Sequence, residues 1–183
     1  MSAFALTREE ILGALADMNR RLEGQGIIGE ICLFGGALMV LAFNARLSTK
    51  DVDALFQPST EVRHAAAQVA AERGWPEAWL NDGVKGFISA RHEITAGQLP
   101  QFSNLRLTMP TPEYLLAMKC VAARIGLGAG ESDDTSDIRF LIRHLGLTTA
   151  GSVLDLVAAY FPADRIPAKT RFLVESLFEE GLS

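Results

Sequence analysis

A pair of glycines between two apolar runs constrains this chain more than any other feature. Gly35-Gly36 follow the apolar run Ile31–Phe34. Fifteen residues after Gly36, Asp51-Val52-Asp53 leads into a second apolar run, Ala54–Phe56. Apolar runs bounded by glycine predict buried strands, and the apolar stretch 37–43 predicts a short buried helix between them. The pattern therefore predicts a unit of strand, tight turn, helix and second strand.

The second predicted strand opens with two carboxylates. Asp51 and Asp53 are two residues apart, and side chains at i and i+2 of a strand point to the same face. Mg²⁺ binds one or two carboxylates together with phosphate oxygens, and two such ions can clamp the attacking and leaving oxygens of phosphoryl transfer. An exposed polar edge would produce the same two residues by chance, so the pair alone leaves both interpretations open.

The glycine pair favours the metal interpretation. Glycine lets the backbone approach a ligand closely and adopt a positive φ. A helix that starts at Ala37 would offer free N–H groups and a partly positive end to a phosphate. A tight turn without a ligand would also need glycine. The combination of the turn with Asp51 and Asp53 is more specific, and it indicates a nucleotide phosphate site that holds Mg²⁺.

The rest of the chain divides after residue 109. Capping-box spacing at Thr7–Glu10 predicts the start of a first helix. Thr111 and Pro112 suit the cap and first turn of another helix. Other predicted elements are a helix over 59–73, strands over 87–89 and 105–109, helices over 114–124, 134–145, 149–161 and 167–180, and a glycine-rich loop over 126–132. The expected class is α+β, with a small mixed sheet and flanking helices in 1–109 and a helical region in 110–183.

Composition narrows the setting. The chain has 183 residues, enough for one domain or one compact core with a small appendage. Its net charge of −5 argues against non-specific binding to the nucleic-acid backbone but is compatible with a local basic patch. Charged residues at 8–10 exclude an apolar signal core there, and the longest apolar stretch, Ile31–Phe43, is shorter than the roughly 20 residues that span a bilayer. We expect a cytoplasmic protein with no membrane segment. Cys32 and Cys120 are expected to be buried free thiols rather than a disulfide.

The glycine pair and the two aspartates resemble the nucleotidyltransferase superfamily related to DNA polymerase beta. Its hallmark is an apolar strand, Gly-Gly or Gly-Ser, and then Asp–x–Asp or Asp–x–Glu on the next strand. The lead-in Arg46-Leu-Ser48-Thr49-Lys50 is similar to that of the AbiEii-type toxin branch, where an arginine and then serine or threonine precede the aspartates.

The second half of the chain resembles the same branch. Members carry Lys–x–x–Ala–x–Arg on one helix and Asp–x–x–Asp at the start of the next. This chain has Lys119-Cys-Val-Ala122-Ala-Arg124 and later Asp134-Thr-Ser-Asp137. The connector Trp79-Leu-Asn-Asp82 is similar to a segment of uncharacterised relatives. The resemblance covers about residues 28–145.

The resemblance implies a Mg²⁺-dependent nucleotidyltransferase, with Mn²⁺ as a substitute ion, that moves a nucleoside monophosphate from a nucleoside triphosphate to a hydroxyl group. The acceptor would be RNA, such as tRNA, or a protein side chain, and an antitoxin protein would be the partner. Asp137 would pair with Lys119 or Arg124. The implied site residues are Gly35, Gly36, Ser48, Thr49 and Lys119 for the nucleotide, Asp51 and Asp53 for the metal, and Asp51, Asp53, Lys119 and Asp134 for catalysis.

Two departures leave alternatives open. Many members carry a third carboxylate on a later strand, whereas residues 102–109 contain none, and position 133 is Asp where the branch favours a basic residue. A catalytically silent protein of this fold that binds a nucleotide or a partner is therefore the alternative function. Asp134 could be an ordinary helix cap. Lys119 could be an exposed lysine on a helix flank.

Overall fold

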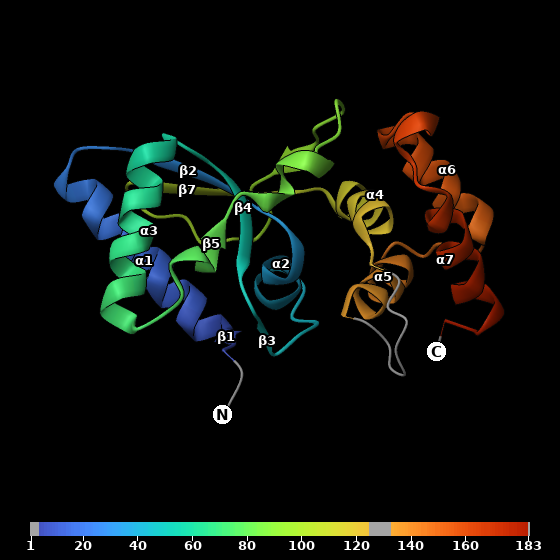
Figure 1. Ribbon diagram of the computed structural model, residues 1–183, viewed down its shortest axis with the longest axis horizontal. Helices are drawn as coiled ribbons and strands as arrows, with labels where there is room; N and C mark the ends of the chain where they lie inside the picture. The colour runs from blue at the N-terminus through green and yellow to red at the C-terminus, as the bar shows by residue number, and fades with distance from the viewer. Residues whose placement is uncertain (1–3, 125–132, 183) are drawn as a thin grey trace. The chain divides into compact units, whose positions relative to one another are not determined.

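A computed structural model describes residues 4–124 and 133–182 (Figure 1). The described chain forms two compact units. The first runs to Gly86 and includes Ile94–Met109, and the second comprises Phe87–Glu93 and the chain from Pro110 onward. The sequence-based division also falls after residue 109, but it had not separated residues 87–93 from the first unit. The predicted loop over 126–132 lies outside the described residues.

The α+β class predicted from the sequence is confirmed. In the first unit the chain orders its elements as β1 (Leu6–Thr7), α1 (Arg8–Gly24), β2 (Gly29–Leu33), α2 (Gly35–Leu41), β3 (Ser48–Thr49), β4 (Val52–Gln57), α3 (Ser59–Arg73), η1 (Glu77–Trp79), β5 (Leu80–Asn81), η2 (Gly83–Phe87), β6 (Ile94–Thr95) and β7 (Leu105–Pro110). The main sheet has the order β5-β4-β2-β7-β6. It is mixed, because β2 runs antiparallel to β4 and parallel to β7, and β4 runs parallel to β5.

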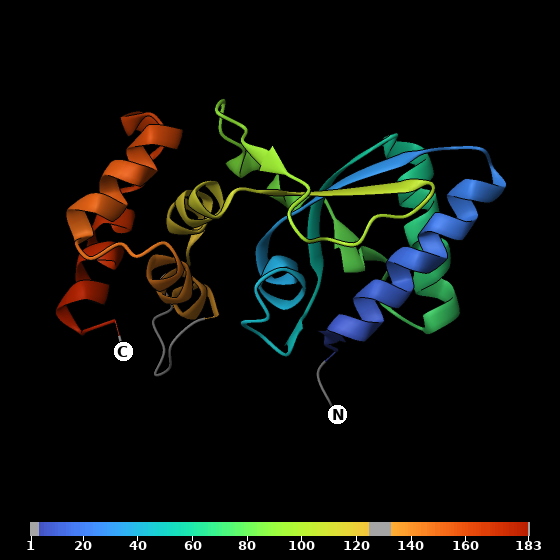
Figure 2. The same cartoon turned by 180° about the vertical axis from the view of Figure 1, so that it is seen from behind.

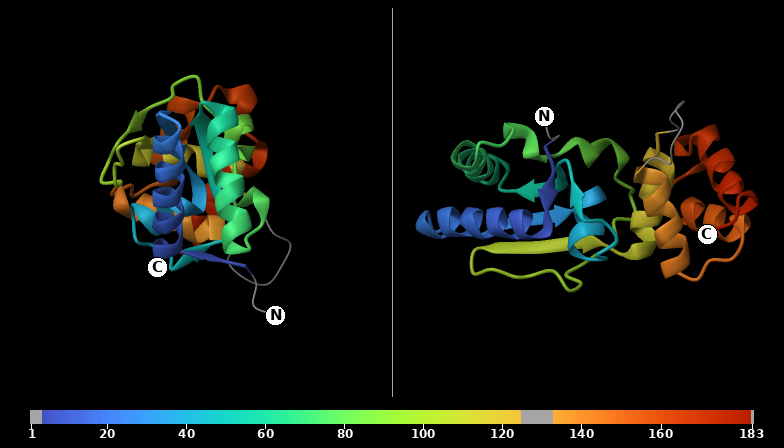
Figure 3. Two further views of the ribbon diagram at one scale, coloured as in Figure 1. Left: turned by 90° about the vertical axis from the view of Figure 1, so that its left-hand side faces the viewer. Right: turned by 90° about the horizontal axis from the view of Figure 1, so that it is seen from below.

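One face of this sheet is the core of the first unit. Its side chains alternate along β2, β4 and β7 and are fully buried: Ile31, Leu33, Val52, Ala54, Leu105 and Leu107. Helices α1 and α3 lie side by side on it (Figure 3). A Cβ atom on Gly29 would lie 2.8 Å from Leu22 of α1 and 3.3 Å from Val62 of α3, so glycine lets both helices approach β2. The polar side chains of the same strands alternate with these residues and point to the opposite face of the sheet.

The capping box predicted at the start of α1 is present. The Thr7 hydroxyl accepts a hydrogen bond from the Glu10 backbone N–H, and the Glu10 carboxylate accepts one from the Thr7 N–H. The bonds that the Glu10 carboxylate accepts from the Thr7 N–H and the Thr7 hydroxyl lower the pKa of Glu10. Helix α3 ends as expected at Gly74, which adopts the left-handed conformation with a φ of +66°.

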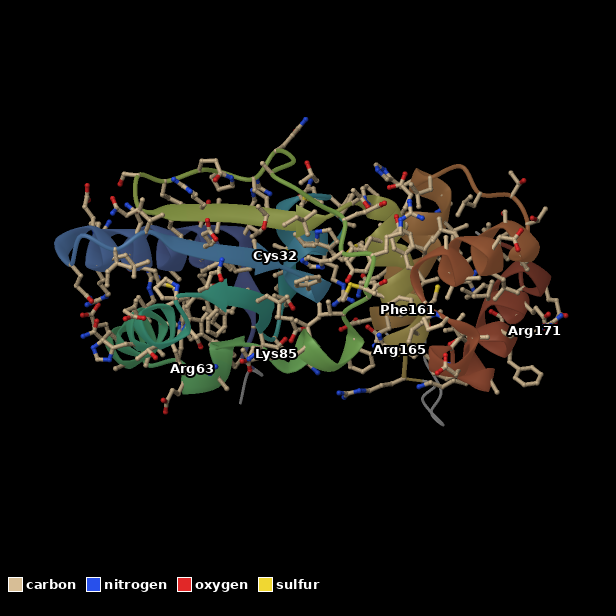
Figure 4. All side chains as sticks on the ribbon, turned by 90° about the horizontal axis from the view of Figure 1, so that it is seen from above. Cys32, Arg63, Lys85, Phe161, Arg165 and Arg171 are labelled. Carbon is tan, nitrogen blue, oxygen red and sulfur yellow. The ribbon has the colours of Figure 1, made fainter. Side chains whose placement is uncertain are left out.

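The second unit is helical, as expected. Its helices are α4 (Pro112–Ala122), α5 (Asp133–His144), α6 (Ala150–Tyr160) and α7 (Ala168–Glu179), with a 3-10 turn η3 (Ala163–Arg165). Helix α4 contacts α5, α6 and α7 and is buried from Tyr114 to Val121 (Figure 2). The predicted cap is present, since the Thr111 hydroxyl accepts a hydrogen bond from the Tyr114 N–H. Arg165 of η3 stacks over Phe161, both labelled in Figure 4.

The strand predicted over 87–89 is wrong. Residues 88–93 are irregular and pack within the second unit. The backbone groups of Ser89 and Ile88 bond to side chains: the Ser89 N–H donates to the Tyr114 hydroxyl at 2.9 Å, and Arg165 donates to the Ile88 carbonyl at 3.1 Å. The apolar run Phe87-Ile88 had predicted strand pairing, but side chains from distant parts of the sequence bind this segment instead.

Two tyrosines hold this segment, residues 87–93. The rings of Tyr114 and Tyr160 stack with centroids 5.1 Å apart, and Arg91 lies over the Tyr160 ring at 4.9 Å. The Tyr160 hydroxyl donates to the Glu93 carboxylate at 2.6 Å, and Arg91 pairs with Glu93 at 2.6 Å. These bonds lower the pKa of Glu93, whereas burial raises the pKa of Tyr160.

Both cysteines are free and buried, Cys32 in β2 and Cys120 in α4. Within the part of the chain that the structure describes, no helix combines the length and apolar character needed to cross a membrane.

Candidate functional site

The structure brings the glycine pair against the aspartate strand within the first unit. Gly35 adopts a φ of +60°, in the left-handed region that side chains disfavour. A Cβ atom at Gly35 would lie 2.8 Å from Asp53 Oδ2 and 3.7 Å from Asp53 Cβ. The backbone of the turn therefore lies directly against the Asp53 carboxylate, in a space that only glycine fits.

Gly36 makes an equally close approach to the polar lead-in. A Cβ atom there would lie 2.6 Å from the Thr49 hydroxyl and 3.4 Å from a guanidinium nitrogen of Arg46. Thr49 is buried, and its hydroxyl donates to the Asp51 carbonyl at 3.2 Å. The predicted nucleotide residues Gly35, Gly36 and Thr49 thus lie together beside Asp53.

Ser48 and Thr49 form strand β3, which pairs with β1. Ser48 is the register partner of Thr7, and Thr49 is the partner of Leu6. Ser48 is half-buried. This two-residue pairing of β1 with β3 holds the backbone in place so that Thr49 lies against the glycine turn. Such short pairs carry no periodicity, so no sequence pattern predicted this one.

Asp51 and Asp53 flank the buried Val52 at the start of β4, as predicted. Val52 is fully buried, Asp53 is half-buried and Asp51 is exposed immediately before the strand. The backbone carbonyl of Asp53 accepts a hydrogen bond from the Phe34 N–H at 2.8 Å. That bond extends the pairing of β2 with β4 to the residue before Gly35, which is why the glycine turn meets Asp53.

Helix α2 is fixed at its far end by Arg8. The Arg8 guanidinium donates to the carbonyl of Leu41 at 2.5 Å and to that of Val40 at 3.3 Å. A cation suits the carbonyl end of a helix. The helix begins at Gly35, two residues before the predicted start, and ends at Leu41, after which Asn44 turns the chain with a φ of +50°.

The neighbouring strands supply polar groups to the face of the sheet that carries Asp53. On β7, Thr108 is the register partner of Cys32 and hydrogen-bonds its thiol. Burial raises the pKa of Cys32, labelled in Figure 4, to about 11. Strand β7, Leu105–Pro110, contains no carboxylate. On the other side of β4, Asn81 of β5 is the register partner of Asp53.

The donors present limit the kind of metal site. Among the described residues, no group of three or more His, Cys, Asp or Glu side chains is arranged to hold a metal ion. The carboxylates available at the start of β4 are those of Asp51 and Asp53. Two carboxylates fit Mg²⁺ when phosphate oxygens of a bound nucleotide complete the coordination. They do not suit a tightly held structural metal.

Lys119 and Asp134 come together in the second unit. Lys119, only 8% exposed, places its ammonium 2.6 Å from Asp137 and 3.7 Å from Asp134. Asp137 is 1% exposed and Asp134 is 39% exposed. The predicted pairing of Asp137 with Lys119 is therefore present, and it links α4 to α5. Lys119 is not an exposed lysine on a helix flank. Asp134 lies in the first turn of α5, where a carboxylate suits the helix dipole.

Comparison with known proteins gives no match: no family model, no curated protein and no solved structure is similar to this chain. The function of this chain is therefore inferred from the chemistry of its own residues.

Two residues of the first unit, Arg8 and Asn81, were not among the predicted site residues. Arg8 lies 32 residues before Val40, and nothing local marks it as a partner of α2. Asn81 follows the buried pair Trp79-Leu80 and precedes Asp82-Gly83. An Asn-Asp-Gly sequence after an apolar pair indicates a turn at the end of a strand, which was the available signal for the end of β5 but not for its position beside Asp53.

Proposed function

We propose that this protein is a Mg²⁺-dependent nucleotidyltransferase. It would transfer a nucleoside monophosphate from a nucleoside triphosphate to a hydroxyl group and release pyrophosphate. The observation that carries the proposal is the approach of Gly35 to Asp53, with 2.8 Å between the position of a Cβ atom and Asp53 Oδ2. A turn with no side chain would let its backbone approach phosphate oxygens closely, next to the carboxylate strand that would hold a cation.

Each site residue of the first unit has a defined role in this proposal. Asp51 and Asp53 hold the cation that the triphosphate brings, and Mn²⁺ can replace Mg²⁺ there. The backbone at Gly35-Gly36 lies along the triphosphate, with Ser48 and the hydroxyl of Thr49 behind the second glycine. Arg46, whose guanidinium is near Gly36, offers planar N–H donors that match phosphate geometry. Positioning and charge neutralisation then supply most of the catalysis.

Lys119 and Asp134 remain proposed catalytic residues of the second unit. By the sequence resemblance, Lys119 would neutralise phosphate charge and Asp134 would serve as an additional carboxylate. Lys119 is already paired with Asp137. If Lys119 moved away from Asp137 to contact a phosphate, its buried ammonium would need that phosphate as a replacement anion, because an unpaired buried charge is strongly destabilising. A triphosphate would be such an anion.

The acceptor and the biological setting extend the proposal by analogy. The acceptor is RNA, such as tRNA, or a protein side chain, and the reaction takes place in the cytoplasm. An antitoxin protein would then inhibit the enzyme as the second member of a toxin–antitoxin pair. The fold by itself does not imply these roles.

One observation favours a second function, a catalytically silent protein that binds a nucleotide or a partner. The position on β7 beside Cys32 holds Thr108, which cannot bind a second cation as a carboxylate would. If two carboxylates do not suffice for turnover, the site retains Mg²⁺-dependent nucleotide binding without release of pyrophosphate.

Transfer of α-³²P label tests both functions. The protein is incubated with Mg²⁺, total cellular RNA and each nucleoside triphosphate in turn. The Asp51→Asn/Asp53→Asn double variant serves as the inactive form, and Asp155→Asn, at an exposed position of α6, is the matched control. Label on RNA or on the protein that is lost only in the double variant supports the transferase. Nucleotide binding without label supports the silent protein. Full labelling by the double variant contradicts both.

A further inference from the structure

Asn81 lies beside Asp53 on the same face of the sheet. The two residues are register partners on the parallel strands β4 and β5, as are Val52 and Leu80, which are both buried. Register partners on neighbouring strands point to the same face, and the strands are about 4.8 Å apart. The half-buried amide of Asn81 is therefore the nearest side chain of β5 to the Asp53 carboxylate.

The orientation of the Asn81 amide is fixed by its own turn. Its oxygen accepts a hydrogen bond from the Gly83 N–H at 3.0 Å. A backbone N–H is a donor only, so the atom facing it is the amide oxygen and the other terminal atom is the NH₂ group. Among the described residues, no group accepts a hydrogen bond from this NH₂. The turn thus holds a donor without a protein acceptor on the face that carries Asp53.

We propose that the NH₂ group of Asn81 donates a hydrogen bond to a phosphate oxygen of the nucleotide bound at Asp53. The inference rests on the proposed function. A cation held by Asp53 would share its coordination with phosphate oxygens, and Asn81 is the neighbouring polar side chain on the next strand. Asn81 is thus a nucleotide-binding residue, and its amide matches an acceptor where a carboxylate would repel one.

The alternative is that Asn81 only shapes the turn. Asparagine and aspartate serve equally in such turns, since either accepts the bond from Gly83. Asn81→Asp separates the two roles, because it keeps the acceptor and replaces the NH₂ donor with a negatively charged oxygen. Asn81→Ser replaces the NH₂ donor with a shorter hydroxyl group and adds no charge. Asp82→Asn is the matched control, because Asp82 instead pairs with Arg63 and Lys85, both labelled in Figure 4.

The experiment measures the Kd of the Mg²⁺ complexes of the four α,β-methylene nucleoside triphosphates, which cannot transfer their nucleotide. The full-length wild type, Asn81→Asp, Asn81→Ser, Asp82→Asn and Asp53→Asn are compared, with thermal midpoints to verify folding. We expect Asn81→Asp to weaken the tightest complex about tenfold or more, Asn81→Ser to weaken it less, and Asp82→Asn to stay within about twofold of wild type.

The outcomes distinguish this inference from the proposed function. If Asn81→Asp binds as tightly as the wild type while Asp53→Asn loses Mg²⁺-dependent binding, Asn81 is only a turn residue and the inference is wrong. If the wild type binds none of the four complexes, or if Asp53→Asn binds them equally well, the proposed function fails and the role of Asn81 fails with it.

Discussion

Gly35 and Asp53 leave no room between them for a methyl group. A Cβ atom on Gly35 would come within 2.8 Å of Asp53 Oδ2, closer than van der Waals contact allows. The same glycine has a φ of +60°. Steric space and backbone conformation therefore require glycine at this position for independent reasons, and both bear on the proposed site.

Gly35→Ala is expected to destabilise the protein. The left-handed conformation alone costs a residue with a side chain about 1–2 kcal/mol, and the contact with Asp53 adds to that cost. Urea unfolding measures the change. Gly24→Ala, at the end of α1 where a Cβ atom meets nothing within 4 Å, is the control and should be slightly more stable than the wild type, because alanine favours the helix. If Gly35→Ala were as stable as Gly24→Ala, the turn at Gly35-Gly36 would not require glycine.

Asp137→Asn is expected to destabilise the protein far more than Asp134→Asn. Both carboxylates face Lys119, but Asp137 is 1% exposed at 2.6 Å and Asp134 is 39% exposed at 3.7 Å. Removal of one partner of a buried ion pair costs about 3–5 kcal/mol, whereas an exposed pair contributes about 0–1 kcal/mol. Urea unfolding of both variants at pH 7 provides the comparison. Similar losses would mean that the two carboxylates share the ammonium equally.

Both cysteines are expected to resist alkylation in the native protein. Burial raises the pKa of Cys32 to about 11 and that of Cys120 to about 12. At pH 8 about one Cys32 thiol in a thousand is then ionised, and the thiolate is the reactive form. Iodoacetamide followed by mass spectrometry should label neither residue in buffer and both in denaturant. Rapid native labelling of Cys32 would show that its face of the sheet opens.

Glu93→Gln is expected to lower stability at neutral pH and to have no effect in acid. The Tyr160 hydroxyl, and then Arg91, hold the pKa of Glu93 below its ordinary value of 4.5. A lowered carboxyl pKa adds stability above the unfolded-state value, and this stability is lost as the pH falls through the native value. Thermal midpoints of the two proteins from pH 7 to pH 3 should therefore converge. A constant difference would assign the effect to packing instead of charge.

The sequence predicted the elements with strong local signals. The helix over 59–73 was placed correctly because an amphipathic repeat precedes Gly74, which ends it in the left-handed conformation. The starts of α1 and α4 followed from Thr7 and Thr111, whose side chains accept the expected capping bonds. In these places the residues that determine the structure lie within a few positions of one another.

The elements that were missed depend on distant residues. The conformation of residues 88–93 is determined by Tyr114 and Tyr160, 25 and 71 positions beyond Ser89. At the candidate site, alternation along β4 placed Asp53 correctly. Its neighbour Asn81 could not be inferred, because register between strands depends on the pairing of the whole sheet and leaves no local pattern.

The location of residues 87–93 has an evolutionary consequence. The chain leaves the first unit after Gly86, rejoins it at Ile94 and leaves again after Met109. A single recombination event at residue 109 would carry Arg91 and Glu93 away with the first unit and separate them from Tyr160, to which both bind. The two units are therefore poorly suited to exchange as independent modules, and a lineage that keeps one is expected to inherit the other.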